Sequence, residues 1–131
     1  MKKTGVLNRA LAATIAGMGH TDLLVVADAG LPVPPGVPCI DLAVAPGVPG
    51  VLDALGAIAA ELQVEAITIA AELAAGDTGL PGAVRALFPA ATLGTVSHDD
   101  LKAMSARARA VVRTGECTPY ANVVLASGVT F

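Results

Sequence analysis

The stretch that decides the fold is LLVVADAG, residues 23–30. Its first five residues are apolar, so a strand built from them would be hydrophobic on both faces. The polar Asp28 and the turn-forming Gly30 follow at once. An apolar run of this length that ends in turn residues predicts a strand buried in the middle of a sheet, with Asp28 at its carboxyl end.

The segment before this strand predicts an amphipathic helix over residues 8–19. Asn8 is a good N-cap, and apolar residues recur at spacings of four and three from Leu11 to Met18. Gly19 marks the helix end. His20 is therefore expected just after a helix and just before the buried strand.

Strands and helices alternate along the rest of the chain. Residues 31–38 contain four prolines and predict a stiff loop. The other expected elements are a strand over 39–45, a helix over 47–63, strands over 66–73 and 92–96, a helix from 97 to 115, and a strand over 121–129. This order predicts an α/β fold, a single three-layer domain over residues 1–131 with a mixed, largely parallel central sheet flanked by helices. Ligands on such sheets bind beyond the carboxyl ends of the strands.

Two of these segments have distinctive ends. In residues 76–91, Gly and Pro flank a short helix-like piece, which is expected to form an exposed arm or an interface segment. Ser97 and Asp100 have the spacing of a helix cap, and the apolar stripe that follows predicts a helix that Gly115 ends.

Composition excludes several classes of protein. The chain is 54% hydrophobic, but charged residues, Gly or Pro interrupt every run long enough to span a membrane. Its start does not resemble a signal peptide, so a cytoplasmic location is expected. The net charge of −3 provides no basic field for nucleic acid. So much apolar surface on a small domain predicts a homo-oligomer.

Cys39 and Cys117 are far apart and lack a C-x-x-C spacing. Neither a disulfide nor a zinc site is favoured, and buried thiols are expected. No metal site is predicted elsewhere in the chain.

The stretch GMGHTD, residues 17–22, superficially resembles a phosphate-binding loop. A dinucleotide fingerprint needs a third glycine where Asp22 stands, and it follows a strand rather than a helix. The polar groups at element ends remain as candidates: His20, Asp28, His98 and, four residues after His98, Lys102. Taken alone, each histidine fits either a surface or capping role or a catalytic one, and Lys102 fits a solvated helix lysine.

Residues 113–128 place many polar groups between an expected helix end and the last strand. They include Tyr120, the only tyrosine, and Asn122. The segment is either a self-satisfied turn or part of a site, and the Tyr120 ring either faces a sugar or packs in the core.

Four separated blocks carry a resemblance that covers nearly the whole chain. They are LNRALAATIAGMGHTDLLVVADAGLPVP at 7–34, CIDLAVAPGVPGVLDAL at 39–55, VSHDDLK at 96–102 and VVRTGECTPYANVVLASGVTF at 111–131. In this order they resemble the D-ribose pyranase family. Fucose mutarotases share the GHTD and DA landmarks more loosely.

The resemblance implies a cofactor-independent isomerase, a mutarotase that interconverts the pyranose and furanose forms of D-ribose. It implies a catalytic His20. Sugar contacts are implied at Asp28, His98, Lys102, Tyr120, Ala121 and Asn122. The family resemblance also implies a pentamer or a decamer with the sugar cleft between neighbouring subunits. The alternatives are a mutarotase for another aldose such as L-fucose, a non-catalytic sugar-binding accessory of a ribose transport system, and a structural ring protein with a vestigial cleft.

Overall fold

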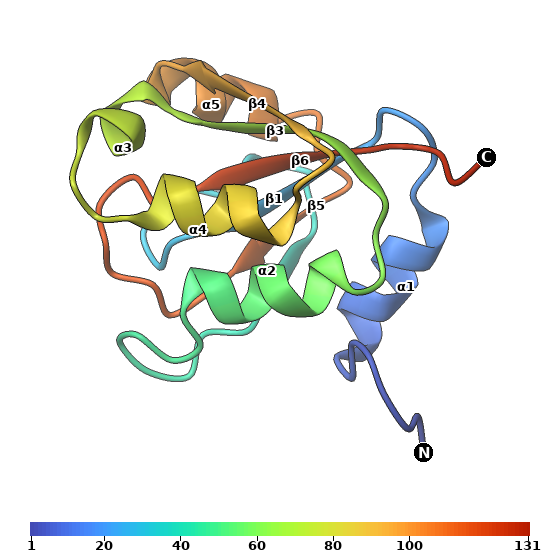
Figure 1. Ribbon diagram of the computed structural model, residues 1–131. Coiled ribbons are helices and arrows are strands. Elements are labelled where there is room, and N and C mark those ends of the chain that lie inside the picture. The colour runs from blue at the N-terminus through green and yellow to red at the C-terminus, as the bar shows by residue number, and fades with distance from the viewer.

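A computed structural model describes residues 1–131. The LLVVA run forms a strand inside a six-stranded sheet of order β2-β5-β1-β6-β3-β4 (Figure 1). In chain order the elements are α1 (Arg9–Gly17), β1 (Leu23–Ala27), β2 (Cys39–Asp41), α2 (Val51–Ala59), β3 (Val64–Ala70), α3 (Ala71–Ala75), α4 (Leu80–Leu87), β4 (Thr92–Val96), α5 (His98–Ser105), β5 (Ala110–Arg113) and β6 (Val123–Ser127).

The sheet is mixed and largely parallel, as predicted. β1 pairs in parallel with β5, β5 with β2, and β3 with β4, whereas β6 is antiparallel to both β1 and β3. The carboxyl ends of all strands except β6 therefore lie at one edge of the sheet, together with the start of β6. We call this the carboxyl edge, and the opposite end the amino edge.

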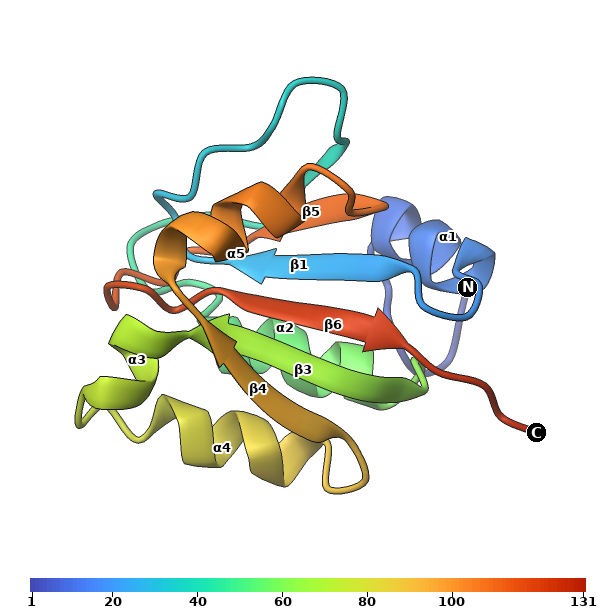
Figure 2. The same cartoon turned by 90° about the horizontal axis from the view of Figure 1, so that it is seen from above.

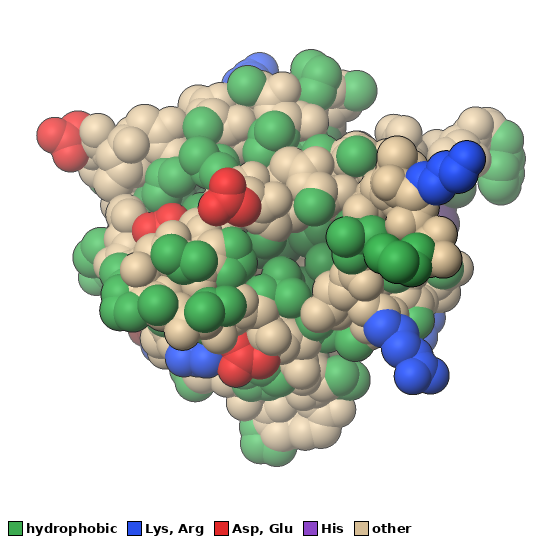
Figure 3. All heavy atoms as spheres, turned by 90° about the horizontal axis from the view of Figure 1, so that it is seen from below, with side chains coloured by type: hydrophobic (Ala, Val, Ile, Leu, Met, Phe, Trp, Pro, Cys, Tyr) green, Lys and Arg blue, Asp and Glu red, His purple; other side chains and the backbone are tan.

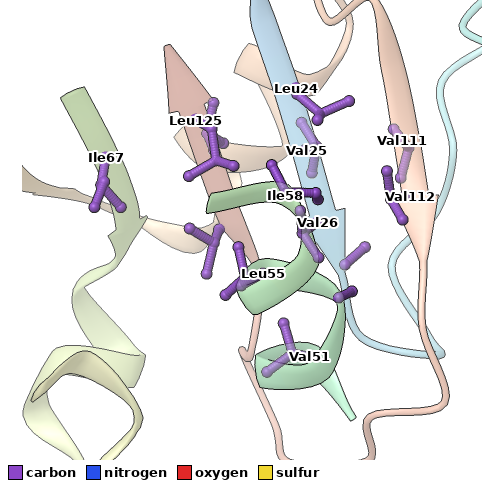
Figure 4. Close-up of a cluster of buried hydrophobic side chains, with 14 of the residues drawn as sticks. Leu24, Val25, Val26, Val51, Leu55, Ile58, Ile67, Val111, Val112 and Leu125 are labelled. Atoms are coloured by element: carbon purple, nitrogen blue, oxygen red, sulfur yellow. The ribbon is translucent and has the colours of Figure 1, made fainter. Parts of the chain in front are cut away.

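Helices cover both faces of the sheet, which gives the predicted α/β layers. α2 and α4 lie on one face and α5 on the other (Figures 1 and 2). Leu55 and Ile58 of α2 are fully buried against the sheet, close to Val26 and Leu125 (Figure 4). Burying one such side chain stabilises the fold by about 1.5–3 kcal/mol.

The first helix and the central strand follow the sequence closely. Asn8 caps α1, because its side-chain oxygen accepts a hydrogen bond from Leu11 N at 2.9 Å. Leu24, Val25 and Val26 are completely buried, since β1 has a strand on each side and helices on both faces.

Several predicted boundaries were wrong. β2 ends at Asp41, and residues 45–48 form a tight turn instead of continuing the strand. β3 starts earlier than expected and stops at Ala70, after which the chain turns into the short helix α3. α2 is shorter than the predicted helix because Pro and Gly occupy the turn before Val51.

The expected helix from residue 97 to 115 was wrong in its second half. Ser97 does cap α5, accepting from Asp100 N at 3.1 Å, but the helix ends at Ser105. Residues 110–113 form β5, which is paired on both sides, and Val111 and Val112 are fully buried there. A short apolar run fits either a helix stripe or a buried strand, and pairing with β1 and β2 decides for the strand.

The segment over 76–91 is not an exposed arm. It contains α4, which packs against α2, and Val84 and Phe88 belong to the hydrophobic core at 1% and 5% exposure. The prediction of buried thiols was also wrong, because Cys39 and Cys117 are both exposed.

Apolar side chains remain on the surface. Hydrophobic side chains are spread over the face that Figure 3 presents, with charged groups at only a few places. The large exposed ones in the whole chain are Met1, Leu7, Val44, Val48, Tyr120, Val129 and Phe131. None of the helices has the length and hydrophobicity needed to cross a bilayer.

Candidate functional site

A pocket of about 220 Å³ opens at the carboxyl edge of the sheet. We call it the carboxyl-edge pocket; it is lined by Asp28, Gly30, Leu31, Pro32, His98, Tyr120 and Asn122. Its residues come from the ends of β1 and β4 and the start of β6, where the sequence predicted a ligand site. The volume is below the roughly 300–1,000 Å³ typical for drug-sized ligands, which suits a small molecule.

Asp28 and Asn122 form a reciprocal clamp on the pocket floor. Asn122 Oδ1 accepts from Asp28 N, and Asn122 Nδ2 donates to Asp28 Oδ2, both at 2.9 Å. Gly30 N donates to Asp28 Oδ1 at 3.0 Å. Each carboxylate oxygen keeps a second lone pair, so Asp28 can still accept hydrogen bonds from a ligand.

His98 starts α5 and is held by its backbone. Its N–H donates to the Glu72 carboxylate, at 3.0 Å to Oε2 and 3.2 Å to Oε1. The ring nitrogen Nδ1 is buried and has no hydrogen-bond partner, which leaves Nε2 as the nitrogen available to a ligand. Because an N–H buried without an acceptor is costly, this arrangement favours the tautomer with its proton on Nε2 over the one with its proton on Nδ1.

Tyr120 faces the pocket rather than the core. The residue is 41% exposed, and its ring meets the His98 ring edge-on, with centroids 5.1 Å apart. Its backbone has φ of 63°, a conformation that non-glycine residues rarely adopt. Strained backbone of this kind is typical of functional loops, and here it places the only tyrosine over the pocket.

His20 lies at the amino edge, far from the carboxyl-edge pocket. It lines a separate pocket of 380 Å³ with the end of α1, residues 62 and 63, and the C-terminal residues 127–131. Its Nε2 is 2.8 Å from Glu65 Oε2 on β3. The next residue, Thr21, is the only other non-glycine residue with positive φ, at 66°.

Within one chain, His20 and Asp28 lie at opposite edges of the sheet. The five residues of β1 lie between them, and at about 3.3 Å per residue they span roughly 16 Å. Asp28 therefore does not orient the His20 imidazole of its own chain. The structure brings together Asp28, His98, Tyr120 and Asn122 but not His20.

Two further predicted site residues, Lys102 and Ala121, do not present their side chains to the carboxyl-edge pocket. Lys102 does not line the carboxyl-edge pocket; its Nζ pairs with Asp99 Oδ1 at 2.7 Å. Ala121 is 1% exposed, so its side chain belongs to the core, between two site residues.

The turn that carries His20 is fixed by an ion pair. Asp22 Oδ2 accepts from Gly19 N at 2.8 Å and pairs with Arg109 at 2.9 Å. The hydrogen bond from Arg109 holds the pKa of the Asp22 carboxyl below its usual range, so the carboxylate stays ionised and keeps the turn closed.

Sequence reasoning missed Glu65 and Glu72. Each is an acidic residue on or just after β3, and each contacts a histidine that lies far away in the chain. Strand alternation could have placed Glu65 on an exposed face, but nothing in the sequence pairs either glutamate with its histidine. No group of three or more His, Cys, Asp or Glu side chains lies close enough together to hold a metal ion.

The carboxyl-edge pocket combines one carboxylate, one amide, one imidazole and one phenol. These groups offer both donors and acceptors around a small volume, which suits a ligand with several hydroxyl groups. The phenol and imidazole rings add apolar surface that can lie against carbon–hydrogen bonds.

Comparison with known proteins shows which family the chain belongs to. Residues 1–130 match the RbsD / FucU transport protein family. The chain is 56% identical over 131 residues to D-ribose pyranase from Symbiobacterium thermophilum and 53% identical over 132 residues to the D-ribose pyranase of Paracidovorax citrulli, covering all of both chains in each case. A solved structure of Bacillus subtilis RbsD complexed with D-ribose superposes with a TM-score of 0.95 at 46% identity over the full length of both chains. The family match over residues 1–130 and the full-length identity to these relatives show that this chain belongs to the RbsD / FucU transport protein family.

Proposed function

We propose that this protein is a sugar isomerase, a mutarotase that interconverts the pyranose and furanose forms of D-ribose. The observation that carries the proposal is the carboxyl-edge pocket, because its carboxylate, amide, imidazole and phenol groups suit a polyol. Two relatives of more than 50% identity over the full length are named D-ribose pyranase, and a solved relative of 46% identity is complexed with D-ribose. These similarities support ribose as the substrate.

Changing the ring size requires proton transfers but no oxidation, so the reaction needs no cofactor. A base takes the proton of the anomeric hydroxyl while an acid protonates the ring oxygen, and the ring opens to the aldehyde. Another hydroxyl then adds to the aldehyde carbon, and the protons move in the opposite sense. Histidine suits such exchange near neutral pH because its unperturbed pKa is about 6.5.

His20 is the proposed proton donor. Asp28, His98, Tyr120 and Asn122 are the proposed sugar contacts in the carboxyl-edge pocket. Ala121 contributes through its backbone, since its side chain is buried. Lys102 is a weaker candidate contact, because its ammonium already pairs with Asp99 and lies outside the pocket lining.

A site that uses both His20 and Asp28 needs two copies of the chain. The two residues lie at opposite edges of the sheet, so the amino edge of one copy meets the carboxyl edge of the next. Such head-to-tail contacts close into rings when the rotation permits. The exposed Val129 and Phe131 lie beside His20, where this contact would bury them. This arrangement supports a homo-oligomer with the site between subunits, and the family resemblance implies that the ring is a pentamer or a decamer.

The proposed location is the cytoplasm, where such an enzyme would act on ribose after its uptake. The family description also names transport, which favours one second candidate, a non-catalytic sugar-binding accessory of a ribose transport system. That candidate uses the same pocket without proton transfer.

Exchange NMR on D-ribose separates the two candidates. With catalytic amounts of protein, saturation of a pyranose anomeric signal should pass to the furanose signals faster than in buffer, and His20→Ala should remove this enhancement. Line broadening without faster exchange would support the accessory and overturn the isomerase. L-fucose measured in parallel tests the aldose preference.

A further inference from the structure

We infer that Glu65 is a positioning residue for His20, holding the imidazole so that Nδ1 is the nitrogen that exchanges a proton with the sugar. This inference rests on the proposed function of His20. The contact that carries it is the 2.8 Å separation between His20 Nε2 and Glu65 Oε2, the one side-chain hydrogen bond that His20 makes.

The pair joins two segments that the backbone already fixes. Glu65 stands on β3, and the His20 turn is bound to the end of β6 by Thr21 N to Ser127 O at 2.8 Å and by Ser127 N to Asp22 O at 2.9 Å. Gly128 N in turn donates to Gln63 O at 2.9 Å. These bonds link the His20 turn to β3 through β6. The backbone therefore fixes where the Glu65 carboxylate lies relative to the His20 imidazole.

Close packing beneath the pair supports the same conclusion. A Cβ at Gly128 would lie 3.1 Å from Glu65 Cβ, so the end of β6 lies directly against the glutamate. The side chains themselves stay open to a neighbouring subunit, at 54% exposure for His20 and 42% for Glu65.

The hydrogen bond decides which ring nitrogen is free. A carboxylate only accepts, so Nε2 must carry a proton, and in the neutral ring Nδ1 is then the acceptor. In the protonated ring, Nδ1–H gives its proton to the ring oxygen as the C1–O5 bond breaks, and the bond electrons remain on that oxygen. The anomeric proton passes to a pocket base. When the O4 hydroxyl adds to C1, its proton returns to Nδ1 and the carbonyl oxygen recovers the anomeric proton.

The test compares Glu65→Gln with Glu61→Gln. Each variant removes one carboxylate charge near the amino edge, but Glu61 pairs with Lys2 and Val6 rather than with a histidine. Glutamine can either accept from or donate to Nε2, so Glu65→Gln no longer fixes the tautomer. We expect it to lower kcat for ring exchange by about tenfold or more with little change in KM, because the defect lies in proton transfer. Glu61→Gln should retain the wild-type rate.

Long-range ¹H–¹⁵N NMR of the imidazoles gives a second readout that does not depend on activity. The chain has only two histidines, and His20→Ala assigns them. At alkaline pH the wild type should show His20 protonated on Nε2, and Glu65→Gln should show a mixture of tautomers.

Three outcomes would overturn the inference: an Nδ1–H tautomer in the wild type, an unchanged tautomer in Glu65→Gln, or a wild-type rate of ring exchange in Glu65→Gln. If the wild type failed to accelerate ring exchange at all, the proposed function would fall instead, and the tautomer spectrum would still decide the role of Glu65.

Discussion

Asp28 and Asn122, 94 residues apart in the chain, hold each other through two hydrogen bonds of 2.9 Å at the carboxyl edge of the sheet. Antiparallel pairing of β1 with β6 brings them together, because Val26 lies opposite Val123. Asn122 is completely buried. Its amide therefore has two roles: it holds the Asp28 carboxylate in one orientation, and it can also contact a ligand.

Asn122→Ala should weaken both the fold and the sugar site. It leaves the Asp28 N–H without its acceptor and frees the carboxylate to rotate, so we expect a loss of about 2 kcal/mol in the free energy of unfolding. KM for ribose should rise. Denaturant unfolding at fixed protein concentration and exchange NMR measure the two effects.

Ser105→Ala is a matched control for this change. It also removes a buried hydrogen bond, from Ser105 Oγ to Lys102 O at 2.6 Å, but at the opposite end of α5 from His98. It should cost about 1 kcal/mol and leave KM unchanged. Equal effects of the two variants on KM would contradict the role given to Asn122.

Mixing two inactive variants should restore activity if the site lies between subunits. His20→Ala removes the proton donor from the amino edge, and Asp28→Asn alters the carboxyl edge. When the two chains are unfolded and refolded together in equal amounts, about one interface in four combines the intact edges of both. Ring exchange at roughly that fraction of the wild-type rate is expected, measured against each variant refolded alone. A mixture no more active than the separate variants would argue for a site within one chain.

The sequence predicted the sheet core well, because LLVVA is apolar on both faces and ends in Asp28. It did not predict β5, since the apolar residues around Val111 also continue the stripe of the preceding helix. Only pairing with β1 on one side and β2 on the other separates the two possibilities. Strand pairing is a long-range effect that local periodicity does not contain.

The candidate site could be predicted only in part. Asp28, His98, Tyr120 and Asn122 stand at element ends that the parallel strands bring to one edge, where they line the carboxyl-edge pocket. Their contacts with sugar stay a prediction. The position of His20 at the other edge follows from the strand that separates it from Asp28. Its contact with Glu65 depends on how β3 and β6 pair, which the sequence does not show.

Gly115→Ala should disturb the loop that leads to Tyr120. Gly115 does not end a helix, as its sequence position suggested; it packs against the turn at residues 45–49, with its N–H donating to Pro49 O at 2.8 Å. A Cβ there would lie 2.5 Å from Val48 O and 2.6 Å from Val48 N, so backbone must move. We expect a loss of about 2 kcal/mol or more in the free energy of unfolding, together with weaker ribose binding.

Gly56→Ala controls for the loss of a glycine. Nothing lies within 4 Å of a Cβ at Gly56, which is inside α2, so this variant should be as stable as the wild type or more stable. If Gly115→Ala kept full stability and affinity, the close approach to Val48 would have no energetic importance.

Glu116 should make stability depend on pH. Burial raises the pKa of its carboxyl, but hydrogen bonds from Thr118, Val51 and Cys117 outweigh burial and hold the pKa below its usual range. Folding therefore favours the ionised form. This contribution is fully present above the ordinary pKa of about 4.3 and is lost as the pH falls through the lower value in the folded protein.

Glu116→Gln measures that contribution directly. At pH 7 it should lower the free energy of unfolding by about 1–2 kcal/mol, since the carboxylate also caps the start of α2 through Val51 N at 3.3 Å. The difference from the wild type should shrink as the pH is lowered below about 4, because the wild-type carboxyl then becomes neutral as well. Asp77→Asn, in the exposed turn between α3 and α4, should leave the free energy of unfolding unchanged both at pH 7 and below about pH 4. A difference for Glu116→Gln that stayed constant down to pH 3 would mean that side-chain shape, and not charge, stabilises this turn.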